Sequence, residues 1–216
     1  MTDMSLRLRG EQGRRERWQQ IVDAARKVFF EKGFERTTID DIEKASGLTR
    51  GAIYYHFKGK EEIYISVLTC GLRLLRDELR WTLRDRNASP EELVGRFFDK
   101  YSEFSRTHRE YMNILDHFHS GWETQHELPQ NLVEEVNRLF FECINEAVSV
   151  VELGMKQGVF KVRDPFLETI MLWSMASSAL RKTTANPRTA FLGVDWQTMK
   201  KALKKRILSS LACERI

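Results

Sequence analysis

One segment of this sequence carries side chains suited to binding a polyanion. It runs from Thr37 to Lys60, TTIDDIEKASGLTRGAIYYHFKGK, and mixes hydroxyl, aromatic and basic side chains. Hydroxyls, ring N–H groups and ammonium groups suit phosphate oxygens, and arginine commonly binds the O6 and N7 atoms of guanine. The charge distribution points the same way, because residues 1–60 hold 13 basic and 9 acidic side chains whereas residues 61–216 hold 22 of each. We therefore expect the first 60 residues to contact a nucleic acid.

Four histidines form a second group with possible chemistry: His108, His117, His119 and His126. Imidazole is a common zinc ligand. However, His117 and His119 are two residues apart, which directs them to different sides of a helix, and the sequence has no H-E-x-x-H motif. We expect hydrogen-bonded or pocket-lining histidines and no metal, with a His-liganded metalloprotein left as an alternative. No nucleophile elbow or glycine-rich phosphate loop occurs, so we expect neither an enzyme nor a cofactor.

The elements that must position these residues are helices. Only 4 prolines and 12 glycines occur, and the segments between them repeat apolar residues every three or four positions. The pattern predicts an all-α fold of about nine helices, with a less regular region around 111–125. The clearest predicted helices cover residues 14–32, 38–46, 50–57, 60–84, 90–106, 129–157, 166–183 and 195–211.

The polyanion-binding segment has the pattern of a helix-turn-helix. Thr38 can cap one short helix, and Ser46-Gly47-Leu48 makes a turn in which glycine allows a sharp reversal. The second helix directs Ile53 and Phe57 inward and its other face outward, and a helix of this size fits the major groove of B-form DNA. The residues expected to bind DNA are Thr37, Thr38, Thr49, Arg50, Gly51, Tyr54, Tyr55, His56 and Lys60.

The run from Ile39 to Phe57, followed by Lys60-Glu61-Glu62, closely resembles the DNA-binding segment of the TetR (tetracycline-repressor-like) family of bacterial regulators. The similarity covers about residues 14–65. It implies a ligand-responsive regulator, most simply a repressor, that binds a palindromic operator as a homodimer through its two C-terminal helices and is released by a small-molecule effector. It also implies a flexible basic arm over 1–13, a DNA-binding domain over 14–60 and a ligand-binding and dimerisation domain over 61–216.

Aromatic residues are concentrated between Phe97 and Trp122, where seven occur although the chain average of 11% predicts about three. Small-molecule pockets are mostly lined by such side chains, so we expect a hydrophobic effector here. A plain aromatic core would explain the same residues. The predicted ligand-binding residues are Phe97, Tyr101, Phe104, His117, Phe118, Trp122 and Trp173.

No membrane segment is predicted. The stretch from Thr169 to Leu180 is uncharged but has only 12 residues, short of the roughly 18 that a membrane span needs. The first ten residues have no apolar run after their arginines, which argues against a secretory signal and for a cytoplasmic protein.

Two alternatives stay open at this level. The arginines near the N-terminus could contact DNA or form a solvated tail; they are Arg7, Arg9, Arg14, Arg15 and Arg17. An all-α protein-interaction module, whose basic segment binds an acidic partner, would show similar patterns but no sequence-specific binding of duplex DNA.

Overall fold

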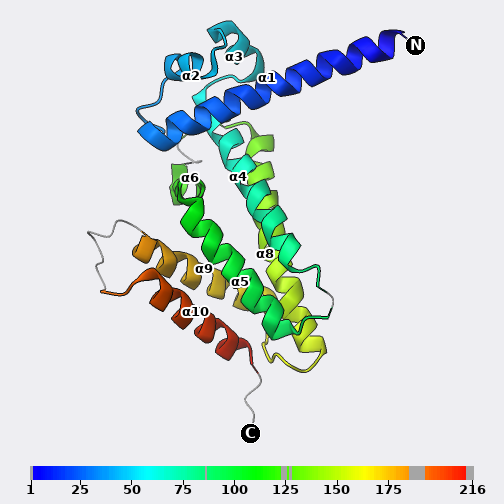
Figure 1. Cartoon of the computed structure of the whole chain (residues 1–216), viewed down its shortest axis with the longest axis vertical. Helices are drawn as coiled ribbons and strands as arrows, with labels where there is room; N and C mark the ends of the chain where they lie inside the picture. The colour runs from blue at the N-terminus through cyan, green and yellow to red at the C-terminus, as the bar shows by residue number, and fades with distance from the viewer. Residues whose placement is uncertain (1, 86, 123–125, 127, 185–192, 213–216) are drawn as a thin grey trace. The chain divides into compact units, whose positions relative to one another are not determined.

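The computed structural model of this chain describes residues 2–85, 87–122, 126, 128–184 and 193–212 (Figure 1). Over these residues the backbone forms nine α-helices, one π-helical turn and no strand, which confirms the predicted all-α fold. The elements are α1 (Thr2–Lys32), α2 (Ile39–Ser46), α3 (Arg50–His56), α4 (Lys60–Thr82), α5 (Pro90–Thr107), α6 (Arg109–His117), η1 (Phe118–Trp122), α8 (Gln130–Lys156), α9 (Pro165–Thr184) and α10 (Trp196–Leu211).

Helix α1 begins at Thr2, whereas the sequence pattern predicted a start near Arg14. Gly10 and Gly13 each disfavour a helix by about 1 kcal/mol relative to alanine. The buried face of α1 begins only at Ile21, so the earlier turns show no apolar periodicity. Residues 2–13 of the basic N-terminal segment are helical in this structure.

The region around 111–125, expected to be less regular, contains α6 and η1. The buried side chains of α6 are Tyr111, Met112, Ile114 and Leu115, which have helical spacing. Gly121 lies at a φ of 94° and interrupts the helical backbone near the end of η1. The prediction missed α6, because this helix is short and has no capping motif in its sequence, but the π-helical turn and the kink at Gly121 agree with a less regular segment.

The chain divides into two compact units along helices that both units share. Helices α4, α6 and α8 each continue from one unit into the other. The first unit comprises Met1–Gly71 with Asn113–Asn137, and the second comprises Leu72–Met112 with Arg138–Ile216. The predicted boundary at residue 60 separates a DNA-binding domain from a ligand-binding domain by function, and it stays a prediction.

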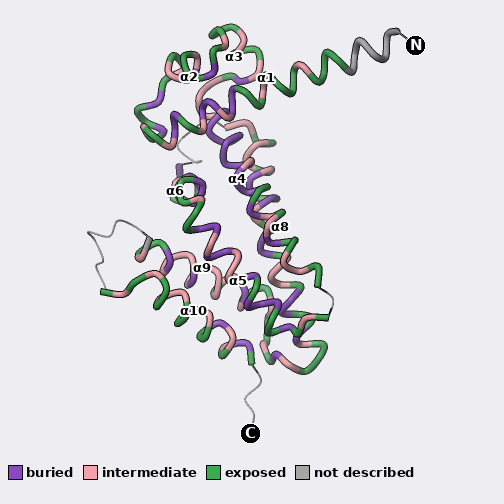
Figure 2. Tube along the Cα trace, in the orientation of Figure 1, coloured by how far each residue is buried: buried purple, intermediate pink, exposed green. Residues whose placement is uncertain are grey.

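The first unit has its core where α1, α2, α3 and the first turns of α4 bury their apolar faces (Figure 2). Helix α1 packs on α2, and α2 packs on α3. Each helix has a narrow apolar stripe, so it is stable only against its neighbours. The core side chains include Ile21, Ala25, Phe29, Ile42, Ile53, Phe57 and Ile63.

The second unit is built around α5, α9 and α10, which pack on one another. Asp99 of α5 accepts from the ammonium groups of Lys200 and Lys204 of α10, at 3.1 and 2.5 Å. The backbone N–H of Lys161 donates to the carbonyl of Leu211 at 2.9 Å, which ties the end of α10 to the connection between α8 and α9. None of the helices in the described ranges is both long and apolar enough to cross a membrane.

Candidate DNA-binding interface and effector cavity

The start of α2 is stabilised by the cap that the sequence predicts. The Thr38 hydroxyl accepts from the backbone N–H of Asp41 at 3.2 Å, and the Asp41 carboxylate accepts from the backbone N–H of Thr38 at 3.1 Å. The Lys32 ammonium also donates to Asp41, at 2.7 Å. This bond and those from Thr38 lower the pKa of Asp41 to about 2. The end of α1 is thereby joined to the start of α2.

The turn between α2 and α3 is centred on Gly47, whose φ of 68° is left-handed. Glycine adopts this conformation without steric cost. The hydroxyl of Ser46 accepts from the backbone N–H of Leu48 at 3.3 Å, and the carboxylate of Glu43 accepts from the backbone N–H of Arg50 at 3.1 Å. The predicted helix-turn-helix is therefore present, and side chains as well as backbone define its turn.

Helix α3 exposes one face that suits DNA. Ile53 is fully buried, whereas Tyr54 and Tyr55 are 50% and 73% exposed. A Cβ added to Gly51 would meet no protein atom within 4 Å, so the protein's own packing does not require glycine there. The missing side chain leaves room for an outside surface to approach. Thr49 caps the helix by accepting from the backbone N–H of Ala52 at 3.3 Å.

The guanidinium of Arg50 forms an ion pair with the carboxylate of Asp40 on α2. Both side chains are more than half exposed, at 54% and 62%. In this conformation the arginine that is expected to bind a base is therefore held by a carboxylate of the preceding helix.

Thr37 and Lys60 form intramolecular hydrogen bonds in this structure. The Thr37 hydroxyl is buried and donates to the carbonyl of Gly33 at 2.7 Å. The Lys60 ammonium donates to the carbonyls of Phe34, Glu35 and Thr37, at 3.2, 3.4 and 3.3 Å. It also lies 4.3 Å from the ring centroid of Phe34. In this structure both side chains satisfy backbone carbonyls at the exit of α1, and their contact with a phosphate stays a prediction.

Two of the predicted ligand-binding residues belong to an aromatic cluster in the first unit. The Tyr64 hydroxyl and His117 Nδ1 are 3.0 Å apart, and Trp122 stacks on His126 with ring centroids 4.3 Å apart. The rings of Phe34 and Trp122 are arranged edge to face, with centroids 4.9 Å apart. Burial raises the pKa of Tyr64. His117 and Trp122 therefore fill space between α1, α4 and the α6–η1 segment.

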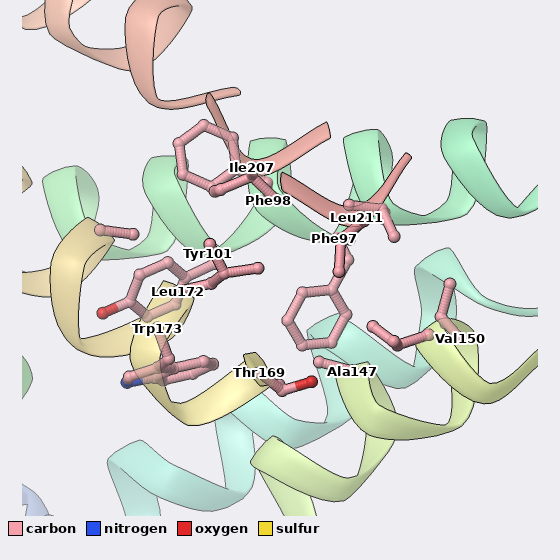
Figure 3. A pocket seen from close by; sticks show the side chains of 13 residues that line it. Phe97, Phe98, Tyr101, Ala147, Val150, Thr169, Leu172, Trp173, Ile207 and Leu211 are labelled. Carbon is pink, nitrogen blue, oxygen red and sulfur yellow. The ribbon is translucent and has the colours of Figure 1, made fainter. Parts of the chain in front are cut away.

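The second unit contains an apolar cavity of about 60 Å³ (Figure 3). Tyr101 and Trp173 lie together on one side of it, with ring centroids 4.2 Å apart, and Phe97 projects between α8 and α9. Thr169 contributes a hydroxyl, which donates to the carbonyl of Pro165 at 2.7 Å. The lining residues are Val94, Phe97, Phe98, Tyr101, Ala147, Val150, Val151, Thr169, Leu172, Trp173, Ala176, Ile207 and Leu211.

This cavity brings together three of the seven predicted ligand-binding residues: Phe97, Tyr101 and Trp173. Its lining does not include Phe104, His117, Phe118 or Trp122. Phe104 is buried against the ring of His108, at 4.6 Å, and Phe118 is 1% exposed. The aliphatic lining from α8, α9 and α10 was missed because an apolar position at helical spacing looks the same whether it lines a cavity or a filled core.

The histidines are dispersed over different contacts. His108 follows α5 as its C-cap, His117 contacts Tyr64, His119 lies beside the Phe118 ring at 5.5 Å, and His126 Nδ1 lies 2.9 Å from the carbonyl of Trp122. Over the described part of the chain, no three His, Cys, Asp or Glu side chains are grouped so that they could hold a metal ion.

Comparisons with known proteins agree with this geometry. The family profile described as "Bacterial regulatory proteins, tetR family" matches residues 21–67. An uncharacterised HTH-type transcriptional regulator, YhgD of Bacillus subtilis, is 28% identical over 152 residues, which cover 70% of this chain and 76% of YhgD.

Two solved structures share the fold over almost their whole length. The TetR family regulator PfmR of Thermus thermophilus is 25% identical with a TM-score of 0.68, covering 89% of this chain and 99% of PfmR. The regulator FadR of Bacillus subtilis, in complex with stearoyl-CoA, is 18% identical with a TM-score of 0.70, covering 90% and 99%. Residues 21–67 therefore carry the DNA-binding segment of the tetR family, and the chain is a DNA-binding transcriptional regulator with an N-terminal helix-turn-helix and a helical C-terminal domain.

Proposed function

We propose that this regulator represses transcription by binding a palindromic operator as a homodimer, and that a small hydrophobic effector releases it. The exposed face of α3 is the observation that carries the DNA-binding part of the proposal. Tyr54, Tyr55 and His56 suit phosphates, while Thr49 and Arg50, at the N-terminus of α3, suit base edges in the major groove. Two copies of α3 would occupy successive major grooves about 34–36 Å apart.

The homodimer is supported by an exposed stripe on α9. Leu167 and Met171 are 53% and 51% exposed, and Ser174 continues the same face at helical spacing. Helix α10 exposes Ala202 and Ser209, whose small side chains allow a partner helix to approach closely. By contrast, Ala176 of α9 and Leu203 of α10 are buried within the chain. A second copy covering α9 and α10 would remove this apolar area from water.

The hydrophobic effector is supported by the lining of the cavity in the second unit. Its walls are aliphatic and aromatic, and they contain no charged side chain. FadR, which shares the fold, was solved with stearoyl-CoA, a molecule with a long apolar chain. A cavity of about 60 Å³ is far smaller than the roughly 300–1,000 Å³ of ordinary ligand pockets. An effector would therefore bind a conformer in which these helices have moved apart.

Release of DNA by an effector requires two conformers of the protein that differ in their affinity for the effector. An effector that prefers the expanded conformer lowers operator affinity only if that conformer binds DNA less well, and the coupling is typically 1–3 kcal/mol. Helix α8 lines the cavity through Ala147, Val150 and Val151, and its first turns belong to the unit that contains the helix-turn-helix. We propose α4 and α8, which run through both units, as the elements that carry the change.

Selection of binding sites from a random pool of duplex DNA tests the proposal. We expect a palindromic consensus. We also expect Tyr54→Ala to weaken binding to all sequences, and Arg50→Ala to lose about 1–3 kcal/mol of discrimination at one position of each half-site. Trp81→Ala, which removes a 68% exposed aromatic side chain outside the first unit, serves as the control. If Tyr54→Ala binds the operator as tightly as this control does, the assignment of α3 is refuted.

The oligomeric state and the effector need separate experiments. We expect a dimer in sedimentation at micromolar concentration, and a monomer would overturn that part of the proposal. Fatty acids of increasing chain length and their CoA thioesters, added to the protein–operator complex, should release it in a chain-length-dependent order. If every such probe leaves both the complex and the thermal unfolding of the protein unchanged, the class of effector is wrong.

A further inference from the structure

A second basic surface lies beside helix α3. The face of α1 that carries Arg14, Arg15 and Trp18 meets the C-terminal half of α3 at Tyr55 and His56. Between them is an open groove of about 690 Å³, which Gln19 also lines. We call it the α1–α3 groove. Its α1 wall lies outside the segment from Thr37 to Lys60 in which the sequence motif concentrates its DNA contacts, whereas Tyr55 and His56 belong to that segment.

The position of the groove is fixed by packing. Trp18 contacts the ring of Phe57 with centroids 6.1 Å apart, and the backbone N–H of Phe57 closes the end of α3 by donating to the carbonyl of Ile53. The rings of Tyr55 and His56 are 5.1 Å apart, edge to face. The floor and one wall of the groove are therefore anchored to the core of the first unit.

The charges of the groove are not neutralised within the described part of the chain. Arg14, Arg15 and Arg17 are exposed, and none of them forms an ion pair with a described carboxylate. In contrast, Arg50 on α3 is paired with Asp40. Burial lowers the pKa of His56, and the positive charges of Arg14 and Arg17 lower it further. An anion there would relieve their mutual repulsion.

We propose that the α1–α3 groove binds a phosphate of the operator backbone, held by Arg14 and Arg15, so that α1 adds a DNA contact beyond those of the helix-turn-helix. The inference rests on the proposed function. Arginine presents several N–H donors that match phosphate oxygens, and the exposed Tyr55 hydroxyl can donate as well. A duplex whose major groove receives α3 carries phosphates along both edges of that groove, within reach of an element that flanks α3. The side chain of Arg7 lies outside the described part of the chain.

The salt dependence of operator binding gives the first test. The slope of log K against log salt changes by about 0.9 for each phosphate contact. Loss of one contact per protomer in the double variant Arg14→Ala/Arg15→Ala should therefore reduce the slope by about 1.8 for a dimer. Lys161→Ala/Arg163→Ala removes the same number of exposed charges from the second unit and should leave the slope unchanged.

Ethylation interference gives the second test, because it identifies individual phosphates. We expect one phosphate in each half-site whose ethylation weakens binding of the wild-type protein but not of Arg14→Ala/Arg15→Ala. Equal thermal unfolding of the two proteins checks that the variant is folded. An identical interference pattern and an unchanged salt slope in the variant overturn the inference while leaving the proposed function intact. If the wild-type protein selects no operator at all, the proposed function itself has failed.

Discussion

The ion pair between Arg50 and Asp40 leads us to expect that removing the charge of Asp40 changes the affinity for the operator. In the proposed complex the Arg50 guanidinium exchanges the Asp40 carboxylate for a base, so we expect the ion pair to compete with DNA. Asp40→Asn removes the competing charge and keeps the size of the side chain. It also removes a negative charge from a surface that is proposed to approach phosphates. Both effects should tighten operator binding.

The magnitude follows from the exposure of the pair. Both side chains are more than half exposed, and exposed ion pairs contribute about 0.2–1 kcal/mol. At 1.4 kcal/mol per tenfold, this corresponds to about 1.4- to 5-fold in affinity for each half-site, or roughly 2- to 25-fold for a dimer. Asp40 also lies in the first turn of α2, where a negative charge interacts favourably with the helix dipole and stabilises the helix. Asp40→Asn should therefore lower the free energy of unfolding by about 0.3–1 kcal/mol while it raises affinity.

Fluorescence anisotropy with a labelled operator at fixed salt measures this change. Asp77→Asn removes the same charge from α4 at a side chain that pairs with Arg76, and should leave the affinity unchanged. In an Arg50→Ala background the gain from Asp40→Asn should shrink, because no guanidinium is left to release. Weaker binding of Asp40→Asn, or a changed base preference, would refute the argument and show instead that Asp40 holds Arg50 in the orientation that binds the base.

Three further predictions concern stability and the cavity. Gly154→Ala should destabilise the protein by about 1–3 kcal/mol in urea unfolding, because a Cβ there would lie 2.1 Å from the buried ring of Phe160. Asp41, whose pKa is lowered from 3.8 to about 2, contributes stability that is present above about pH 4 and is lost as the pH falls towards 2. Thermal unfolding of Asp41→Asn should therefore show a smaller loss of stability than the wild-type protein between pH 5 and pH 2.5. Ala176→Val should fill part of the cavity and abolish the thermal shift caused by the effector, while operator affinity is retained.

Three experimental outcomes would contradict these three predictions. Unchanged urea unfolding of Gly154→Ala would mean that Phe160 moves without cost. Parallel pH profiles for Asp41→Asn and the wild-type protein would place the acid sensitivity on other carboxylates. An undiminished thermal shift for Ala176→Val would place the effector outside this cavity.

Local features of the fold could be predicted closely from the sequence. The cap at Thr38, the left-handed turn at Gly47 and the start of α5 at Pro90 are all confirmed. Each depends on hydrogen bonds between residues two to four positions apart, so the residue types alone indicate them. The N-terminal turns of α1 could not be predicted, because their glycines disfavour a helix and no apolar stripe marks them.

The candidate site was predicted less completely, since its contacts join distant segments. Lys60 suits a phosphate by type, but its ammonium is used by carbonyls that lie 23 to 26 residues earlier in the chain. The cavity collects side chains from four helices, and only its aromatic members Phe97, Tyr101 and Trp173 stood out in the sequence. The aliphatic members have the same spacing as any buried helix face.

The sequence by itself determined the all-α fold, the helix-turn-helix and the resemblance of its DNA-binding segment to the TetR family, because helical periodicity, caps and a contiguous motif are local properties of the chain. Only the tertiary structure decided which polar side chains are already used within the protein. It assigns Lys60 to carbonyls and Arg50 to Asp40, and it leaves Arg14 and Arg15 around an open groove. The physical reason is that a cation is neutralised by whichever carboxylate or carbonyl the fold brings within a few ångströms, at any distance along the chain.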